Sequence, residues 1–368
     1  MAETDGGGEV VFTQDSGLKR RPFLRAVVKY GVGDGEVELR DVCEPEIGPQ
    51  DVLLTTRAAG VCGSDIEMWR HHITFPVDPP VTLGHEFGGV VAKVGAEVQG
   101  FSPGDRVVSE TAYHICGVCE FCRAGEYNLC PSRRGFGARA NGAFTRYVRV
   151  PARCLHHIPE GVPFEYAALT EPACVAYNAL TVKSRVTPGD FVVILGPGPI
   201  GLFALQVARL CGAGKTIITG TGADGVRLKI AERLGADYVV DAERTDAVAE
   251  IERITKGRGA PLVVDAAGNS ETLRQSLAVV RRNGQITKIG WGPRPVGFSL
   301  DTLLLKAAAL QGSFSHTWRT WENVLRLIAS GQIQMEPMIT HQMPIAEWHQ
   351  AFHLVEERQA AKVILYPE

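Results

Sequence analysis

Four cysteines lie within fifteen residues, in the segment "CGVCEFCRAGEYNLC", and form the densest group of reactive side chains in the sequence. They are Cys116, Cys119, Cys122 and Cys130. Glycines between them allow the backbone to turn back, so that four thiolates can point at one centre. Four sulfur ligands with no open position are typical of a structural zinc ion. Since Pro131 follows the last cysteine, an iron–sulfur cluster stays open as an alternative, as do reduced surface thiols, although those would be prone to oxidation.

A second group of zinc-type ligands comes from three separate segments. Cys62 lies in "GVCGSD", His85 and Glu86 lie in "GHEFGG", and Glu171 lies in "LTEPACV". Catalytic zinc sites often collect their ligands in this way. Taken singly, each residue also has an ordinary structural explanation: a core cysteine, a surface turn or a helix cap.

The segment "GPGPIG" has the G-x-G-x-x-G spacing of a dinucleotide-binding turn, with Gly196, Gly198 and Gly201 as its glycines and Pro199 and Ile200 between the last two. A strand-like run precedes it and a helical run follows it. This context allows backbone N–H groups and a helix N-terminus to meet a pyrophosphate. The sequence therefore predicts a nicotinamide dinucleotide, with a merely tight turn as the alternative.

The acidic residue expected at the end of the second strand is missing. Such a residue binds the ribose 2′-hydroxyl of NAD, but the sequence there is "IITGTGADGVR". Thr221 occupies the corner, Asp224 comes slightly late, and Arg227 could approach the adenosine ribose or a phosphate. The choice between NAD and NADP stays open, and weak discrimination with some preference for NAD is expected.

The pattern of strands and helices changes near residue 190. Before it, short β-rich runs are separated by Gly, Pro and Asp, as in a small barrel. After it, apolar strands alternate with amphipathic helices, which predicts a doubly wound parallel sheet covered on both faces. The predicted strands of this second part cover 191–196, 215–220, 237–241, 261–268 and 284–290. The fold class is α/β.

Composition favours a small-molecule enzyme. The chain has 368 residues with a formal net charge of −3, so neither nucleic acid nor an anionic membrane is an expected partner. No apolar run approaches the roughly 18 residues that span a bilayer, and no secretory signal is evident, so a cytoplasmic location is expected. Nine cysteines, an odd number, argue against a disulfide framework. Residues 1–22 are polar and Gly-rich, and we expect them to be an extension outside the fold.

Five motifs, in this order, resemble the zinc-dependent medium-chain dehydrogenase/reductase (alcohol dehydrogenase) family. They are "GVCGSD", "GHEFGGVV", the four-cysteine segment, "LTEPACV" and "GPGPIG". Within this family, the chain resembles the polyol (sorbitol or L-iditol) and threonine dehydrogenase branches. The resemblance implies a GroES-like catalytic domain of residues 23–170 and 315–368, with a structural-zinc lobe at about 110–132. It also implies a Rossmann nucleotide-binding domain of residues 171–314.

By the same resemblance, Cys62, His85 and Glu171 match the ligands of the catalytic zinc. Glutamate at the position of Glu171 is the polyol dehydrogenase choice, where classical alcohol dehydrogenases have cysteine. Glu86 matches a carboxylate that either ligates the metal or lies just behind it. Asp65 matches a residue that orients His85.

The catalytic residues are carried over in the same way. Ser64 matches the hydroxyl that bonds the substrate alcohol. Glu67 stands where much of the family has a histidine that completes the proton path, and this departure puts the outer relay in question. His316 is expected to be a pocket residue near the domain crevice.

The expected activity is hydride transfer between a secondary alcohol, such as a polyol or sugar, and a nicotinamide cofactor, with catalytic and structural Zn²⁺. The alternatives are an L-threonine- or formaldehyde-type dehydrogenase with the same machinery, and a non-catalytic nucleotide-binding relative. The apolar segment "TLLLKAAALQGSF" is expected at the edge of the nucleotide sheet, where the family pairs with a second subunit. A homodimer or homotetramer is therefore expected, with burial inside one chain as the competing explanation.

Overall fold

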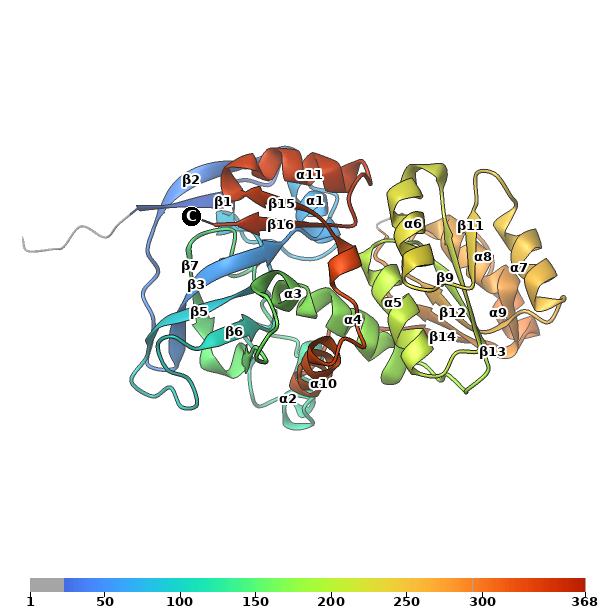
Figure 1. Ribbon diagram of the computed structural model, residues 1–368, viewed down its shortest axis with the longest axis horizontal. Coiled ribbons are helices and arrows are strands. Elements are labelled where there is room, and N and C mark those ends of the chain that lie inside the picture. The colour runs from blue at the N-terminus through green and yellow to red at the C-terminus, as the bar shows by residue number, and fades with distance from the viewer. Residues whose placement is uncertain (1–22, 293, 368) are drawn as a thin grey trace, which may run out of the picture.

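The computed structural model of the chain describes residues 23–292 and 294–367, so the predicted extension at 1–22 lies outside the described residues. A β-rich part and an α/β part, for which the sequence predicts nucleotide binding, lie side by side along the long axis (Figure 1). The last elements of the chain, drawn in red, lie among the first, drawn in blue (Figure 1). The β-rich part is therefore built from both ends of the sequence.

A seven-stranded sheet forms the centre of the β-rich part, in the order β15-β16-β3-β5-β6-β8, with β7 also paired to β3. Its strands are β3 (Asp51–Gly60), β5 (Glu86–Val94), β6 (Arg106–Ser109), β7 (Tyr147–Pro151), β8 (Leu155–His157), β15 (Ile339–Pro344) and β16 (Lys362–Tyr366). A smaller sheet beside it has the order β2-β1-β4. It consists of β1 (Phe23–Lys29), β2 (Val37–Cys43) and β4 (Val81–Thr82).

The C-terminal segment completes the seven-stranded sheet. Strand β16 pairs antiparallel with β3, where Ile364 is opposite Gly60. Helix α11 (Trp348–Glu356) packs on α1 (Gly63–Trp69), with the Trp69 and Trp348 rings 6.3 Å apart in an edge-to-face arrangement. The pairing holds the last residues of the chain next to the segment that carries Cys62. The boundaries of the two domains at residues 170 and 314 stay a prediction.

The nucleotide-binding part is a six-stranded parallel sheet in the order β11-β10-β9-β12-β13-β14. This is the strand order of a doubly wound sheet. The chain first adds strands on one side of β9 and then returns to add the others on its opposite side. Its strands are β9 (Phe191–Leu195), β10 (Lys215–Gly220), β11 (Tyr238–Asp241), β12 (Ala260–Asp265), β13 (Val280–Lys288) and β14 (Ala309–Gly312). Its helices are α5 (Pro199–Leu210), α6 (Gly225–Arg233), α7 (Ala247–Thr255), α8 (Ser270–Val279) and α9 (Asp301–Leu305).

Alternate residues of β9 serve two hydrophobic cores, as a strand covered on both faces requires. Val192 and Ile194 belong to the core that includes α5 and α6. Val193 and Leu195 belong to the core that includes α7 and α8. All four side chains are fully buried. The strand therefore reads as a continuous apolar run, and its end is a fixed point from which the glycine turn leaves the sheet.

Two helices join the two parts. Helix α4 (Thr170–Thr181) and helix α10 (Trp318–Ala329) contribute to the same hydrophobic core as α5. Trp321 in α10 is completely buried. Two short helices, α2 (Glu120–Arg123) and α3 (Phe164–Ala168), complete the β-rich part. Within the described residues, no helix has both the length and the apolar composition to cross a membrane.

Candidate active site and zinc sites

The four cysteines of the 116–130 segment converge as the sequence predicts. Their sulfur atoms all lie within 4.8 Å of one another. Zinc holds thiolates at about 2.3 Å, which places the sulfurs of a tetrahedral site about 3.8 Å apart. The Sγ atoms of Cys116 and Cys122 are 3.9 Å apart. This spacing fits a single ion, whereas a cluster of several iron and sulfide ions needs a wider opening.

Backbone N–H groups stabilise negative charge on these sulfurs. Cys119 N donates to Cys116 Sγ at 3.3 Å, and Cys116 N donates to Cys130 Sγ at 3.3 Å. Hydrogen bonds from Val118 and Cys119 lower the pKa of Cys116 to about 6. Burial and the hydrogen bonds with the thiols of Cys119, Cys130 and Cys116 raise the pKa of Cys122 to about 12. The four thiols therefore do not all ionise together without a cation. The donor set and its polar surroundings therefore fit a structural zinc ion.

The second predicted site forms where α1 and β5 begin. Cys62 is the N-cap residue of α1, Glu86 is the first residue of β5, and His85 directly precedes it. One donor atom from each of these three residues lies within 4.8 Å of the others. Thus two segments that are more than twenty residues apart in sequence bring a thiol, an imidazole and a carboxylate together. Glu171 is not part of this group of three.

Asp65 and Ser64 flank the two nitrogens of His85. Asp65 Oδ2 accepts a hydrogen bond from Cys62 N at 2.9 Å, which closes the first turn of α1. Its Oδ1 lies 3.6 Å from His85 Nδ1 and is buried without a hydrogen-bond partner among the described residues. Ser64 Oγ lies 3.4 Å from His85 Nε2. A ligand on Nε2 would leave Nδ1–H to face Asp65, so the orphaned oxygen fits a metal-bound histidine.

Glu86 forms a fully buried ion pair with Lys362 of β16. Both carboxylate oxygens accept hydrogen bonds from Lys362 Nζ, which also donates to Val61 O at 3.0 Å. Burial opposes the charge on Lys362, but the hydrogen-bonded Glu86 carboxylate, Cys62 and Glu171 together outweigh it and raise the pKa of the lysine. A buried pair of this kind needs both partners, because either charge left alone would be strongly destabilising. The C-terminal strand therefore fixes the carboxylate that lies beside Cys62 and His85.

Glu171, in the first turn of α4, is held from the other side. Its Oε1 lies 3.1 Å from His316 Nε2, and Trp321 Nε1 donates to His316 Nδ1 at 2.7 Å. Because Nδ1 is the acceptor, the proton of the neutral ring is on Nε2 and points at Glu171. Burial opposes ionisation of Glu171, but this hydrogen bond and the nearby charges of His85 and Lys362 lower its pKa. The carboxylate is thereby kept ionised next to the group of three.

The glycine turn after β9 has the geometry of a pyrophosphate site. Gly196 has φ 103°, which suits glycine alone, and a Cβ on Gly201 would lie 1.9 Å from Gly196 O. Gly198 is the N-cap residue of α5 and faces open space. These are the three roles of a dinucleotide-binding turn: a tight turn, close approach of the ligand, and close packing of helix on strand. The residues present therefore fit a dinucleotide.

The corner after β10 is closed by a capping box. Asp224 Oδ2 accepts hydrogen bonds from Thr221 N at 3.1 Å and from Thr221 Oγ1 at 3.0 Å. Arg227 is buried, and its Nε, Nη1 and Nη2 donate to Ala360 O, Asp224 Oδ1 and Val355 O, respectively. Arg227 thus ties α6 to the turn after α11. Asp224, the acidic residue of this corner, therefore uses its carboxylate in hydrogen bonds within the turn itself.

A cleft of about 700 Å³ connects these features. It is lined by the glycine turn, by the corner with Thr221 and Asp224, and by residues of α1 and of the turn after α11. Glu67 lines it together with His72. Burial raises the pKa of Glu67, which His72 lowers and Glu356 raises further. A dinucleotide laid along this cleft would run from the corner toward the helix that begins at Cys62.

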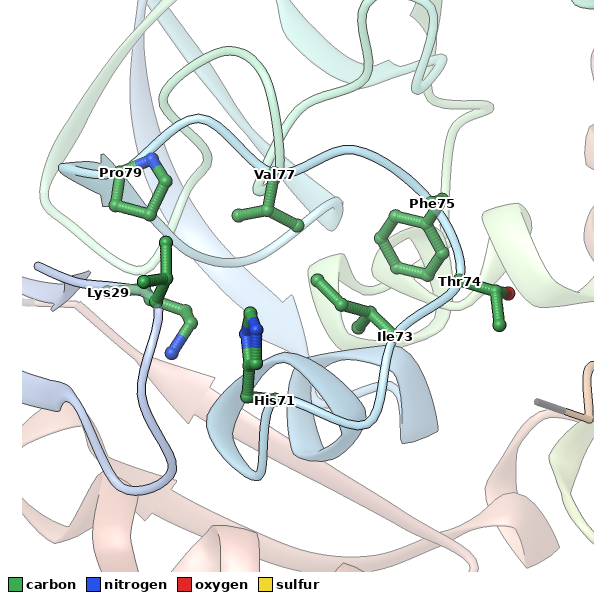
Figure 2. Close-up of a pocket in the computed structure, with 8 residues that line it drawn as sticks. Lys29, His71, Ile73, Thr74, Phe75, Val77 and Pro79 are labelled. Carbon is green, nitrogen blue, oxygen red and sulfur yellow. The ribbon is translucent and has the colours of Figure 1, made fainter. Parts of the chain in front are cut away.

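A second cavity of about 350 Å³ lies under the loop of residues 71–79, and none of the residues that line it lines the cleft. Figure 2 shows Ile73, Phe75 and Val77 along this loop, with Lys29 and His71 beside them. Lys29 is buried, and its Nζ donates to Gly33 O at 2.9 Å. Burial lowers the pKa of this lysine. Because none of the metal-type ligands lines this cavity, it is separate from their cluster.

Sequence reasoning missed two residues of the site, Lys362 and Trp321. Lys362 left a signal, because it is a lone cation in the apolar strand "AKVILY", and a charged residue inside such a strand needs a partner. Trp321 left none, since a tryptophan in an amphipathic helix is an ordinary core residue.

Comparison with known proteins agrees with this geometry. Residues 48–160 match the family model "Alcohol dehydrogenase GroES-like domain", and residues 199–330 match "Zinc-binding dehydrogenase". A sorbitol dehydrogenase of Halalkalibacterium halodurans is 39% identical over 345 residues, covering 94% of this chain and 99% of the relative. A D-arabitol-phosphate dehydrogenase of Enterococcus avium is 36% identical over 343 residues, covering 93% and 97%.

The fold is also found in solved structures. A protein of Sinorhizobium meliloti 1021, described as a zinc-binding dehydrogenase bound to NADP, matches with a TM-score of 0.85 and 31% identity, covering 94% of this chain and all of the other. The chain therefore belongs to the zinc-dependent alcohol dehydrogenase family of medium-chain dehydrogenases, as its motifs predicted. It is an oxidoreductase with a GroES-like part and a Rossmann part, and the predicted fold class is confirmed.

Proposed function

We propose that this enzyme oxidises a secondary alcohol of a polyol, a sugar or a related compound and passes the hydride to a nicotinamide dinucleotide. The single observation that carries the proposal is the buried Glu171 carboxylate, whose Oε1 lies 3.1 Å from His316 Nε2 and whose pKa is lowered, against the effect of burial, by that hydrogen bond and by the charge of His85. A carboxylate in place of a second thiolate adds a hard oxygen ligand and makes the site more polar. Such a site suits a substrate with several hydroxyl groups. The relatives named for sorbitol and arabitol phosphate support the same class.

The proposed catalytic zinc ligands are Cys62, His85 and Glu171, with Glu86 behind them. Both oxygens of Glu86 are taken by Lys362, whereas the hydrogen bond to His316 uses only Oε1 of Glu171. When bound, zinc supplies Lewis-acid polarisation of the substrate oxygen, and the nicotinamide supplies the hydride acceptor. Asp65 orients the His85 ring through Nδ1.

Ser64 is the proposed proton relay, because its hydroxyl lies beside His85 Nε2: it would accept the proton of the alcohol as it gives its own hydroxyl proton to the next acceptor. Glu67 follows three positions later on α1, so both side chains leave the same face of the helix. Glu67 lines the cleft, and its pKa is raised toward neutral pH, where a proton acceptor works best. The proton passes from Ser64 toward Glu67 and leaves through the cleft.

For the cofactor, we infer that the cleft accepts both NAD and NADP. No acidic side chain leaves the end of β10, and Asp224 is engaged by Thr221 and Arg227. The usual barrier against a 2′-phosphate is therefore weak.

A second copy of the chain is the proposed partner of β14. This strand pairs only with β13 among the described residues, and all of its residues are exposed. Leu304 and Leu305 beside it are 77% and 74% exposed. An apolar sheet edge of this kind is suited to pairing with its own copy. A monomer mass in light scattering at micromolar concentration would contradict this assignment.

A substrate panel tests the proposed function directly. Polyols, aldoses, simple secondary alcohols and amino alcohols, including L-threonine, are assayed with NAD and with NADP. We expect the highest kcat/KM for a polyol or its phosphate. A kcat/KM at least tenfold higher for L-threonine or for formaldehyde would overturn the polyol assignment, and no turnover of any alcohol by the zinc-loaded enzyme would overturn the activity.

A further inference from the structure

Arg358 has a backbone conformation that arginine rarely adopts. Its φ is 59°, in the left-handed region, and it follows the C-cap residue of α11. Glycine is the usual residue at this position of a helix end, because a side chain there is strained. A strained residue that persists in a surface turn points to a role for its side chain.

The side chain of Arg358 reaches across the cleft to the nucleotide-binding part. Its Nη1 lies 3.2 Å from Thr221 Oγ1 and 3.4 Å from Asp224 Oδ2. Every hydrogen bond of this side chain within residues 23–292 and 294–367 uses Nη1, and the side chain is 48% exposed. Arg358 also lines the cleft. The other N–H donors of the guanidinium therefore have no hydrogen-bond partner among the described residues, next to the corner where the proposed placement puts the adenosine ribose.

The other two arginines that line the cleft are already engaged. Arg70 makes a bidentate pair with Glu356, at 2.6 and 2.8 Å. Arg227 donates from Nε and from both terminal nitrogens inside the protein. Asp224 accepts hydrogen bonds from both Thr221 groups, from Arg227 and from Arg358, which fills about four acceptor sites of a carboxylate. The trio of Asp224, Arg227 and Arg358 thus carries one net positive charge.

The carboxylate of Glu243 opposes this charge. Glu243, which is exposed after the end of β11, has its Oε2 2.5 Å from the point where a Cβ on Gly222 would lie. It therefore occupies the place of a side chain at the tip of the corner. The corner therefore has the positive charge of Arg358 on the side of the catalytic part and the negative charge of Glu243 at its tip.

We propose that Arg358 binds the 2′-phosphate of NADP, so that the catalytic part, and not only the Rossmann part, decides how well NADP is accepted. The inference rests on the proposed placement of the dinucleotide in this cleft. A guanidinium presents planar, paired N–H donors that match phosphate oxygens, and Nη1 can exchange its two long contacts for such a partner. Glu243 limits the preference by repelling the same phosphate.

The test uses nucleotide fragments and needs no turnover. Binding of adenosine 2′,5′-bisphosphate and of 5′-AMP to the zinc-loaded full chain is measured by titration calorimetry. Arg358→Gly should weaken the bisphosphate by roughly tenfold or more, the scale of one charge-assisted hydrogen bond, and should change 5′-AMP by less than about twofold. Glycine fits φ 59°, so this variant keeps the turn, and an unchanged melting temperature verifies it.

Two further variants sharpen the result. Glu243→Gln should tighten the bisphosphate and leave 5′-AMP as it is. Arg233→Ala is the matched control, because it removes an exposed arginine, paired with Glu336, from α6 of the nucleotide-binding part. It should leave the ratio of the two affinities unchanged.

Equal losses for both fragments in Arg358→Gly, or no loss, would overturn the proposal and leave Arg358 as a contact between the two parts. Failure of both fragments to bind the wild-type chain would overturn it as well. If the difference persists but no alcohol is oxidised, the proposed function fails and this inference stands.

Discussion

The two groups of metal-type ligands in this molecule are built in opposite ways. The cysteine lobe takes four identical ligands from one segment of fifteen residues, and its hydrogen bonds come from its own backbone. The active site takes different ligands from distant segments. The residues that hold two of its carboxylates by hydrogen bonds come from still more distant parts of the chain. Glu86 is paired with Lys362, 276 positions on, and Glu171 with His316, 145 positions on.

This contrast separates stability from chemistry. A closed site of four thiolates has no position for a substrate, so its binding energy contributes only to folding. A site with a mixed donor set, a hydroxyl at Ser64 and a cleft beside it can exchange ligands and protons. Loss of a ligand should therefore affect stability in the lobe and turnover in the active site.

The largest effect outside the active site is expected for Cys119→Ser. The variant removes one of four ligands from a site whose thiols repel one another without a cation, so the lobe should lose its zinc and the melting temperature should fall by roughly 10 °C. Differential scanning calorimetry measures the shift. Cys43→Ser, at an exposed cysteine outside both groups, is the matched control and should melt like the wild type. Unchanged melting of Cys119→Ser would mean that the lobe needs no metal.

A smaller effect in energy, but one confined to catalysis, is expected for Ser64→Ala. Loss of the proposed proton acceptor should lower kcat about 100-fold, on the scale of general acid–base catalysis, which is about 2.7 kcal/mol. Zinc content and melting temperature should stay at wild-type values, because Ser64 is not among the grouped ligands. Near-normal turnover would refute the assigned role.

The same contrast explains what the sequence could predict. The lobe and the glycine turn are contiguous, so spacing alone indicated both, and the alternation of strands and helices indicated the parallel sheet. The residue types of the active-site ligands indicated a candidate catalytic zinc site, but the role of each ligand came only from resemblance to a family. The pairing of Glu86 with Lys362 depends on β16 joining β3, a contact between the two ends of the chain that no local pattern encodes.

The corner after β10 shows a different limit of prediction from sequence. The missing acidic residue was visible in "TGTGAD", but the side chains that surround the corner were not. Arg358 comes from the turn after α11 and Glu243 from the end of β11. Their charges meet only after the two parts of the chain pack together, so the sequence indicated an unusual corner and left its electrostatics open.

Metal analysis of the wild type and of Cys62→Ser, combined with activity and melting, tests the separation of the two sites most directly. We expect two zinc ions per wild-type chain. Cys62→Ser should hold one zinc ion, melt close to the wild type and show no measurable turnover, because it removes a ligand of the active site and leaves the lobe intact. One metal ion or none in the wild type, iron with sulfide in the lobe, or a Cys62→Ser variant that keeps two zinc ions and its activity would contradict the account.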